Sequence, residues 1–194
     1  LELSYPENIG PTISNAIQSN CDVEKLRLIN TANDMPYVVE AVQQIRAHLH
    51  PRIALIGFCG APLTVAAYMI EGKSSKNFIK LKSFMYQQEA AWHALMEKLT
   101  TNLIDYLGAQ IKAGCQAVQI FDSWVGALNA SEYQRFVKKY SHHLINSIQK
   151  QFPNIPVIHF GLAEPYLLKE MSEAGGDVIG LTHHYDLNHL PTFL

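Results

Sequence analysis

The sequence predicts an α/β protein with parallel strands, and a (β/α) barrel is favoured over an open doubly wound sheet. Short apolar runs alternate with amphipathic helical stretches along the chain. No hairpin turn joins one apolar run to the next, so the strands are expected to be parallel and linked by crossovers. The glycine-rich phosphate-binding patterns are absent after these runs, which disfavours a nucleotide-binding open sheet.

The first third of the chain predicts a loop, a helix and a strand. Residues 1–20 show no hydrophobic period and are expected to form a long loop. The polar pair Asn33-Asp34 then predicts the cap of an amphipathic helix with Pro36 in its first turn. The apolar run from Ile53 to Phe58 follows, and it suits a strand covered on both faces.

Two helices are predicted between the first strand and the second. Pro62 begins a helix that Gly72 ends, which completes a strand-turn-helix unit. A longer stretch then carries leucine or isoleucine at four-residue steps until Gly114 stops it. The pattern is compatible with one break near Thr100-Thr101.

The second half repeats the alternation of strand and helix. Ala117 to Phe121 is a second apolar run, and Ser131 and Gln134 have the spacing of a capping box before another amphipathic helix. The remaining pattern predicts a third strand at Val157 to Phe160. A short helix around Leu167 follows and ends at Gly175-Gly176, and a fourth strand is predicted at Val178 to Leu181.

Composition narrows the class of protein. Of the 194 residues 48% are hydrophobic and 16% are charged, so residues 1–194 are expected to form a single folded domain. A formal charge of −2 without a Lys or Arg block argues against nucleic acid or a membrane as the main partner. Three cysteines at irregular spacing suit reduced thiols in the cytoplasm.

Length indicates that the barrel is partial. A complete α/β barrel needs about 250 residues. The chain begins with Leu1 and not with methionine, and we therefore expect it to be a fragment of a longer protein. A cytoplasmic location is expected, with a plastid as the alternative if a transit peptide was lost.

The chemistry is expected at the C-terminal ends of two apolar strands, Leu55 to Gly60 and Val118 to Ser123, because ligands of parallel α/β proteins bind there. After the first strand, the small residues up to Pro62 and a helix N-terminus favour an anion such as a carboxylate. Tyr68 follows in that helix. Its hydroxyl either donates to a substrate carboxylate or its ring simply packs.

At the second strand end, side-chain alternation predicts that Phe121 and Ser123 point to the same side, which places an apolar wall beside a hydroxyl. Asp122 between them is either an acid or base, or a structural hydrogen-bond acceptor. Cys59 is small enough to be a packing residue, and nothing adjacent to it in sequence would lower its pKa.

These strand ends resemble a known family. Gly57 to Pro62, the run from Tyr68 to Gly72, and Gln119 to Trp124 with Gly126 closely resemble motifs of uroporphyrinogen decarboxylase. The likeness also covers Tyr106 to Gly114, the helix start at Ser131 to Tyr140, and Asp177 to Leu181. It spans most of the chain from about Ser19 onward.

The resemblance implies a fold and a reaction. The family fold is a single (β/α)8 TIM barrel that works as a homodimer, and this chain would supply strands three to six. The family decarboxylates the four acetate side chains of uroporphyrinogen to give coproporphyrinogen, with no metal or organic cofactor.

The resemblance also implies roles for four residues. Tyr68 and Ser123 occupy substrate-binding positions, and Phe58 and Phe121 would be apolar walls against the macrocycle. No catalytic residue is assigned in this segment. The family's arginine-bearing segment, its aspartate and its late histidine have no counterpart in these 194 residues.

The sequence departs from the family at two places and leaves alternatives open. Leu63 stands where the family usually has Trp, and residues 182–185 replace an Asp-Trp pair. A metal site at the adjacent His183 and His184 is disfavoured, because neighbours in a strand point to opposite faces and no third ligand is suggested. A related branch of zinc-dependent methyltransferases needs a His-x-Cys pair, whereas this chain has His159-Phe160-Gly161. A non-catalytic remnant that binds a tetrapyrrole or a protein partner is the other alternative.

Overall fold

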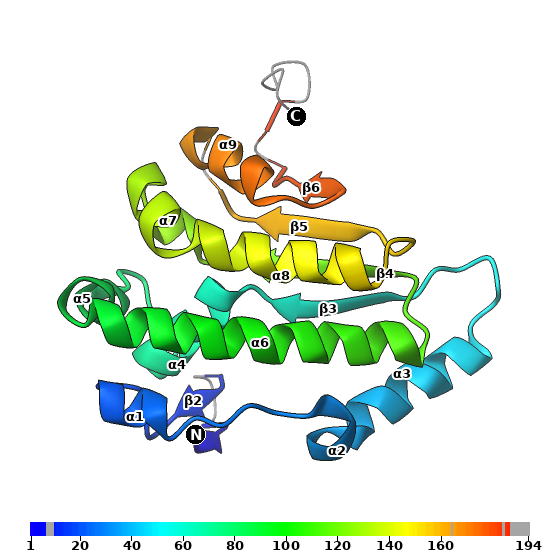
Figure 1. Ribbon diagram of the computed structural model, residues 1–194, viewed down its shortest axis with the longest axis horizontal. Coiled ribbons are helices and arrows are strands. Elements are labelled where there is room, and N and C mark those ends of the chain that lie inside the picture. Colours follow the sequence, from blue (N-terminus) through cyan, green and yellow to red (C-terminus); the bar gives the residue numbers. More distant parts are fainter. Residues whose placement is uncertain (7–9, 164, 184, 187–194) are drawn as a thin grey trace.

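The computed structural model describes residues 1–6, 10–163, 165–183, 185 and 186. At its centre lies a sheet of four parallel strands, which are neighbours in the same order as in the sequence (Figure 1). The strands are β3 (Ile56–Gly60), β4 (Ala117–Asp122), β5 (Val157–Gly161) and β6 (Val178–Gly180). The predicted α/β fold with parallel strands and crossover connections is confirmed.

Helices cover one face of this sheet. The long helix α6 (Glu89–Ala113) runs alongside β3, and α8 (Lys138–Gln151) packs next to α6 (Figure 1). The residues at four-residue steps in α6, from Leu95 to Ile111, are all buried, as the periodicity predicts. Further helices are α3 (Pro36–His48), α4 (Pro62–Glu71), α5 (Ile79–Gln87), α7 (Ala130–Phe136), α9 (Pro165–Ala174) and a short 3-10 helix η1 (Val125–Ala127).

The two faces of the sheet differ in exposure. Val118, Ile120 and Val157 point toward the helices and are fully buried in the core. On the opposite face Phe58 is 59% exposed and Val178 is 50% exposed. The sheet therefore presents an open apolar face opposite its helical layer. Among the described residues, no helix is both long and apolar enough to cross a membrane.

The N-terminal segment contains structure that the sequence pattern missed. Where a loop was predicted, β1 (Leu3–Ser4) pairs antiparallel with β2 (Thr12–Ile13), and α1 (Asn20–Glu24) follows. The paired strands are two residues long, which is too short to produce a hydrophobic period. The backbone N–H of Ile17 donates to the carbonyl of Met69 at 2.9 Å, and this bond fixes the segment against α4.

The predicted cap of α3 was wrong. Asn33 and Asp34 belong to a separate one-turn helix, α2 (Thr31–Asp34), and the side chain of Asn30 accepts from the N–H of Asn33 at 3.1 Å. Helix α3 then begins at Pro36 without a side-chain cap. The polar residues Asn33 and Asp34 thus belong to a helical turn of their own, which ends before α3 begins.

The predicted capping box was displaced by two residues. Asn129, not Ser131, caps α7: its Oδ1 accepts from the N–H of Glu132 at 2.9 Å, and a Glu132 carboxylate oxygen accepts from the N–H of Asn129 at 2.8 Å. Ser131 instead donates to Asn129 Oδ1 at 2.8 Å. Both pairs have capping-box spacing, and Asn is as good a cap as Ser.

Helix α6 is continuous through Thr100 and Thr101. Each threonine hydroxyl donates to the carbonyl four residues earlier, at 2.7 and 3.0 Å, so the helix accommodates both. The interruption of this helical region lies earlier, at Gln88, where the backbone leaves helical geometry between α5 and α6.

Candidate functional site at the strand ends

The C-terminal ends of β3 and β4 are tied to one another. The N–H of Ala61, in the turn after β3, donates to the carbonyl of Phe121 at 2.8 Å. Helix α4 begins at the next residue, with Pro62 in its first turn. The two strand ends that the sequence singled out therefore form one continuous edge.

A row of phenylalanines crosses the open face of the sheet at this edge. The rings of Phe58 and Phe121 meet edge to face with centroids 5.9 Å apart, and those of Phe121 and Phe160 with centroids 5.6 Å apart. Phe121 lies opposite Phe160 in the register of β4 and β5. Three neighbouring strands thus build one apolar wall.

Two members of this wall were predicted and one was missed. The family resemblance predicts apolar walls at Phe58 and Phe121, but it predicts no such role for Phe160. Side-chain alternation along β5 was the signal that could have found Phe160, because His159 and Gly161 turn toward the helices and Phe160 must face the other side.

Tyr68 lies beside the residue that follows Ser123. Its ring packs against Trp124 with centroids 5.7 Å apart, and it remains 38% exposed. Trp124 also packs against Phe78, with centroids 5.1 Å apart. The structure therefore brings Tyr68 and Ser123 to the same edge of the sheet, and the ring of Tyr68 both packs and stays open to solvent.

The segment that holds Phe78 is tightly fixed. Phe78 has a φ of 49°, the left-handed conformation that costs energy for a side chain of this size. Its N–H donates to Ser75 Oγ at 3.1 Å. The buried carboxylate of Glu71 accepts from the N–H of Leu81 at 2.9 Å, at the positive end of α5. These bonds place Phe78 against Trp124.

Asp122 lies on the other side of the sheet from the phenylalanine wall. It is fully buried on the helical side, and Thr64 Oγ1 donates to its Oδ1 at 3.4 Å. Of the two predicted roles, the structural one fits this placement, because the carboxylate is shielded from the open face. Burial also raises the pKa of the Cys59 thiol, which suits a packing residue and not a nucleophile.

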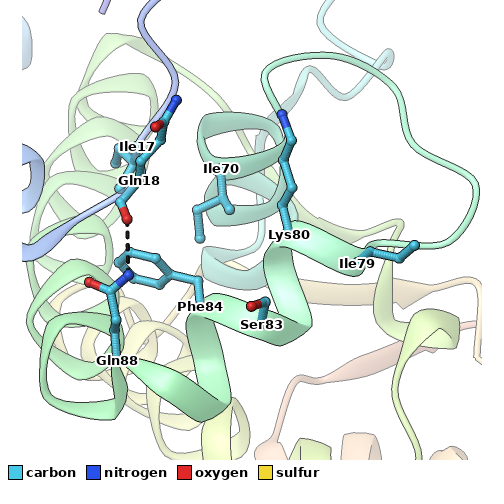
Figure 2. A pocket seen from close by; sticks show the side chains of 8 residues that line it. All are labelled: Ile17, Gln18, Ile70, Ile79, Lys80, Ser83, Phe84 and Gln88. Carbon is cyan, nitrogen blue, oxygen red and sulfur yellow. Dashed lines mark hydrogen bonds between the residues drawn. The ribbon is translucent and has the colours of Figure 1, made fainter.

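Two cavities flank α4 and β3. One of about 510 Å³ lies beside β3 and α6, and Phe58, Val65 and Tyr106 are among the residues that line it. The other, of about 380 Å³, is shown in Figure 2. Its lining includes the buried side chains of Ile70 and Phe84, with Lys80 carrying a charge beside them. This second cavity is separate from the phenylalanine wall.

Leu63 and His183 lie in different surroundings. Leu63, which stands in the position of the family's Trp, is fully buried in the core. His183 is exposed, while His184 lies outside the described residues. Within the described part of the chain, no three His, Cys, Asp or Glu side chains are grouped as a metal site would require.

This architecture defines an α/β protein of the parallel-strand type with an apolar wall at its strand ends, the edge where ligands of such folds bind. The family profile described as "Uroporphyrinogen decarboxylase (URO-D)" matches residues 1–191. The chain belongs to the uroporphyrinogen decarboxylase family.

Individual relatives agree with this assignment. The chain is 45% identical over 187 residues to uroporphyrinogen decarboxylase of Thermus thermophilus, with 96% of this chain and 54% of the relative covered. It is 47% identical over 178 residues to the enzyme of Geotalea daltonii, with 92% of this chain and 52% of the relative covered. The chain thus spans about half the length of these curated relatives.

A solved structure shows the same fold. It is a methyltransferase from Methanosarcina mazei, with a TM-score of 0.68 and 18% identity, and the match covers 92% of this chain and 51% of that one. At this identity the likeness concerns the fold alone.

Proposed function

We propose that the protein acts on uroporphyrinogen, as part of a decarboxylase that removes its acetate carboxyl groups to give coproporphyrinogen. The observation that carries this proposal is the match to the family over residues 1–191, together with an exposed phenylalanine wall at the strand ends. A flat tetrapyrrole offers the apolar surface that such a wall binds.

Tyr68 and Ser123 are proposed as substrate-binding residues beside this wall. Each carries a hydroxyl that can donate to a substrate carboxylate. Phe58 and Phe121 are proposed to contact the macrocycle itself. This division of roles follows their positions, with the rings on the open face and Tyr68 packed next to Trp124.

The chemistry requires more than this edge supplies. Loss of CO2 from a pyrrole acetate is easier once a ring carbon is protonated, and the positive charge that forms calls for a nearby carboxylate. The eight carboxylates of the substrate also need cationic partners. Neither Gly57 to Pro62 nor Phe121 to Trp124 contains Lys or Arg. We therefore propose that residues 1–194 form one partial barrel domain, that they furnish one wall of the pocket, and that the charged wall comes from other parts of a full-length protein.

Anaerobic incubation with uroporphyrinogen tests the proposal. The 194-residue chain should bind the substrate but release no coproporphyrinogen, with products separated as their oxidised porphyrins. Absence of binding would contradict the proposed substrate and favour a remnant with another partner. Turnover would establish the reaction and refute the expectation that the segment alone is inactive.

Two further properties are proposed from the family. The full-length protein is expected to work as a homodimer in the cytoplasm and to need no cofactor. Sedimentation of the full-length protein tests the homodimer, since a monomer at assay concentration would contradict it.

A further inference from the structure

Five polar side chains from five different elements are buried together behind the phenylalanine wall. They are Thr64 of α4, Asp122 of β4, Tyr133 of α7, Ser141 of α8 and His159 of β5, and none is more than 7% exposed. Buried polar groups are costly unless they are paired, so a cluster of this kind in a packed core calls for a reason.

Asp122 and His159 face one another at the centre of this cluster. Asp122 Oδ2 lies 4.0 Å from His159 Nε2, and both side chains are fully buried. Within the described part of the chain neither of these two atoms has a hydrogen-bond partner. The other carboxylate oxygen, Oδ1, accepts from Thr64 at 3.4 Å. An unpartnered carboxylate oxygen and an unpartnered ring nitrogen thus face one another in the core.

Each ring nitrogen of His159 faces an oxygen atom. Its Nδ1 lies 3.3 Å from the carbonyl oxygen of Gly175, which can only accept, so Nδ1 carries a hydrogen. Its Nε2 faces a carboxylate oxygen, which accepts when ionised. A hydrogen on each ring nitrogen would make the ring an imidazolium, whose charge an ionised Asp122 would balance.

The other polar groups of the cluster add no unpaired charge to Asp122 and His159. Thr64 approaches from α4, and Tyr133 and Ser141 from α7 and α8. Burial first, and then the charge of Asp122, raise the pKa of Tyr133, so its hydroxyl stays neutral, although Ser141 acts in the opposite direction. The charge of Glu170 of α9 also raises the pKa of Tyr133, and Lys138 pairs with Glu170 at 2.9 Å.

We propose that Asp122 and His159 form a buried carboxylate–imidazolium pair that positions the substrate-facing ends of β4 and β5. Asp122 stands between Phe121 and Ser123, and His159 immediately precedes Phe160. Since successive residues of a strand face opposite sides, fixing Asp122 and His159 toward the helices fixes the two phenylalanines toward the open face. The pair itself does not depend on the proposed function, whereas the identity of the positioned substrate does.

The charge state can be read by nitrogen-15 NMR of the histidine side chains in the intact chain near pH 7. Both ring nitrogens of His159 should show the shifts of N–H groups. In Asp122→Asn the ring should become neutral and keep its hydrogen on Nδ1, toward Gly175. Tyr133→Phe removes a hydroxyl from the same cluster and should leave the imidazolium unchanged. A neutral ring in the unmodified protein overturns the proposal, even if a variant fails to fold.

The positioning role is tested by titration with uroporphyrin, the stable oxidised octacarboxylate, followed by fluorescence. Asp122→Asn should weaken binding about tenfold, which equals ~1.4 kcal/mol of binding free energy. Tyr133→Phe should bind as the unmodified chain does. Equal affinity in all three proteins, with the imidazolium present, overturns the positioning role. Lack of binding by the unmodified chain counts against the proposed function, while the NMR result still decides the pair.

Discussion

The ring of Tyr68 lies edge-on to that of Trp124, with centroids 5.7 Å apart. This contact joins α4 to the residue directly after Ser123, and so it links two motifs whose contacting residues are 56 positions apart in the sequence. A tyrosine that is packed on one side and 38% exposed on the other can present its hydroxyl to a ligand without losing its place in the fold.

The first prediction concerns the two hydroxyls. Tyr68→Phe and Ser123→Ala should each weaken uroporphyrin binding about tenfold, or ~1.4 kcal/mol, because each removes one hydrogen bond to a charged group. Titration of both variants measures this. Tyr5→Phe is the matched control, since Tyr5 is 77% exposed and its loss of a hydroxyl should change nothing. Unchanged affinity in both site variants would contradict the assignment.

The second prediction separates binding from stability. Phe58→Ala should lower affinity for the tetrapyrrole but cost less than about 1 kcal/mol of unfolding free energy, because Phe58 is 59% exposed. Phe136→Ala should cost about 3–5 kcal/mol, because Phe136 is 1% exposed and packed in the core. Urea unfolding compares the two. A large loss of stability in Phe58→Ala would show that its ring belongs to the core.

The third prediction is a pH dependence at Glu132. Burial raises the pKa of this carboxyl, but the N–H of Asn129, the Tyr86 hydroxyl and Lys82 outweigh burial, and the pKa lies below its ordinary 4.5. A carboxyl with a lowered pKa stabilises the fold above about pH 4.5, and that contribution is lost as the pH falls through the folded value.

Glu132→Gln should therefore be less stable than the unmodified protein at pH 7, and its stability should fall less between about pH 6 and 3. Thermal unfolding across this range gives the comparison. Glu40→Gln, at an exposed position of α3, serves as control and should follow the unmodified protein. Parallel pH curves for Glu132→Gln and the unmodified protein would refute the prediction.

The fourth prediction concerns Lys98, which holds the C-terminal end of α1 against α6. Its ammonium donates to the carbonyls of Val23, Glu24 and Leu26 at 2.9, 3.2 and 2.8 Å. Lys98→Met should cost about 2 kcal/mol, since charged hydrogen bonds are lost and three carbonyls lose a donor. Hydrogen exchange should speed up around α1 but not in β4. Lys112→Met, exposed on the same helix, is the control and should show no such change.

Periodicity predicted the elements that are long or deeply buried. The four-residue leucine pattern of α6 and the four apolar strands are visible in sequence because burial on one or both faces dictates residue type over many positions. The β1–β2 pairing and α2 are too short for such a pattern. The cap of α7 was misplaced because Asn129 and Ser131 both precede a residue of capping-box type by three positions.

The sequence identified only some of the residues that the structure brings together at the strand ends. Four of these residues lie in motifs at strand ends, which can be recognised without knowing how the strands pair: Phe58, Phe121, Tyr68 and Ser123. Phe160 and the pairing of Asp122 with His159 depend on which strands are neighbours and in what register, and that register is a tertiary property.

The most direct test of the proposed site is an NMR titration of the isotopically labelled 194-residue chain with uroporphyrin. We expect the signals of the proposed site residues to shift together as the ligand binds, namely those of Phe58, Phe121, Phe160, Tyr68 and Ser123. Shifts confined to Ile70, Lys80 and Phe84, which line the cavity in Figure 2, would place the ligand elsewhere and contradict the proposed site.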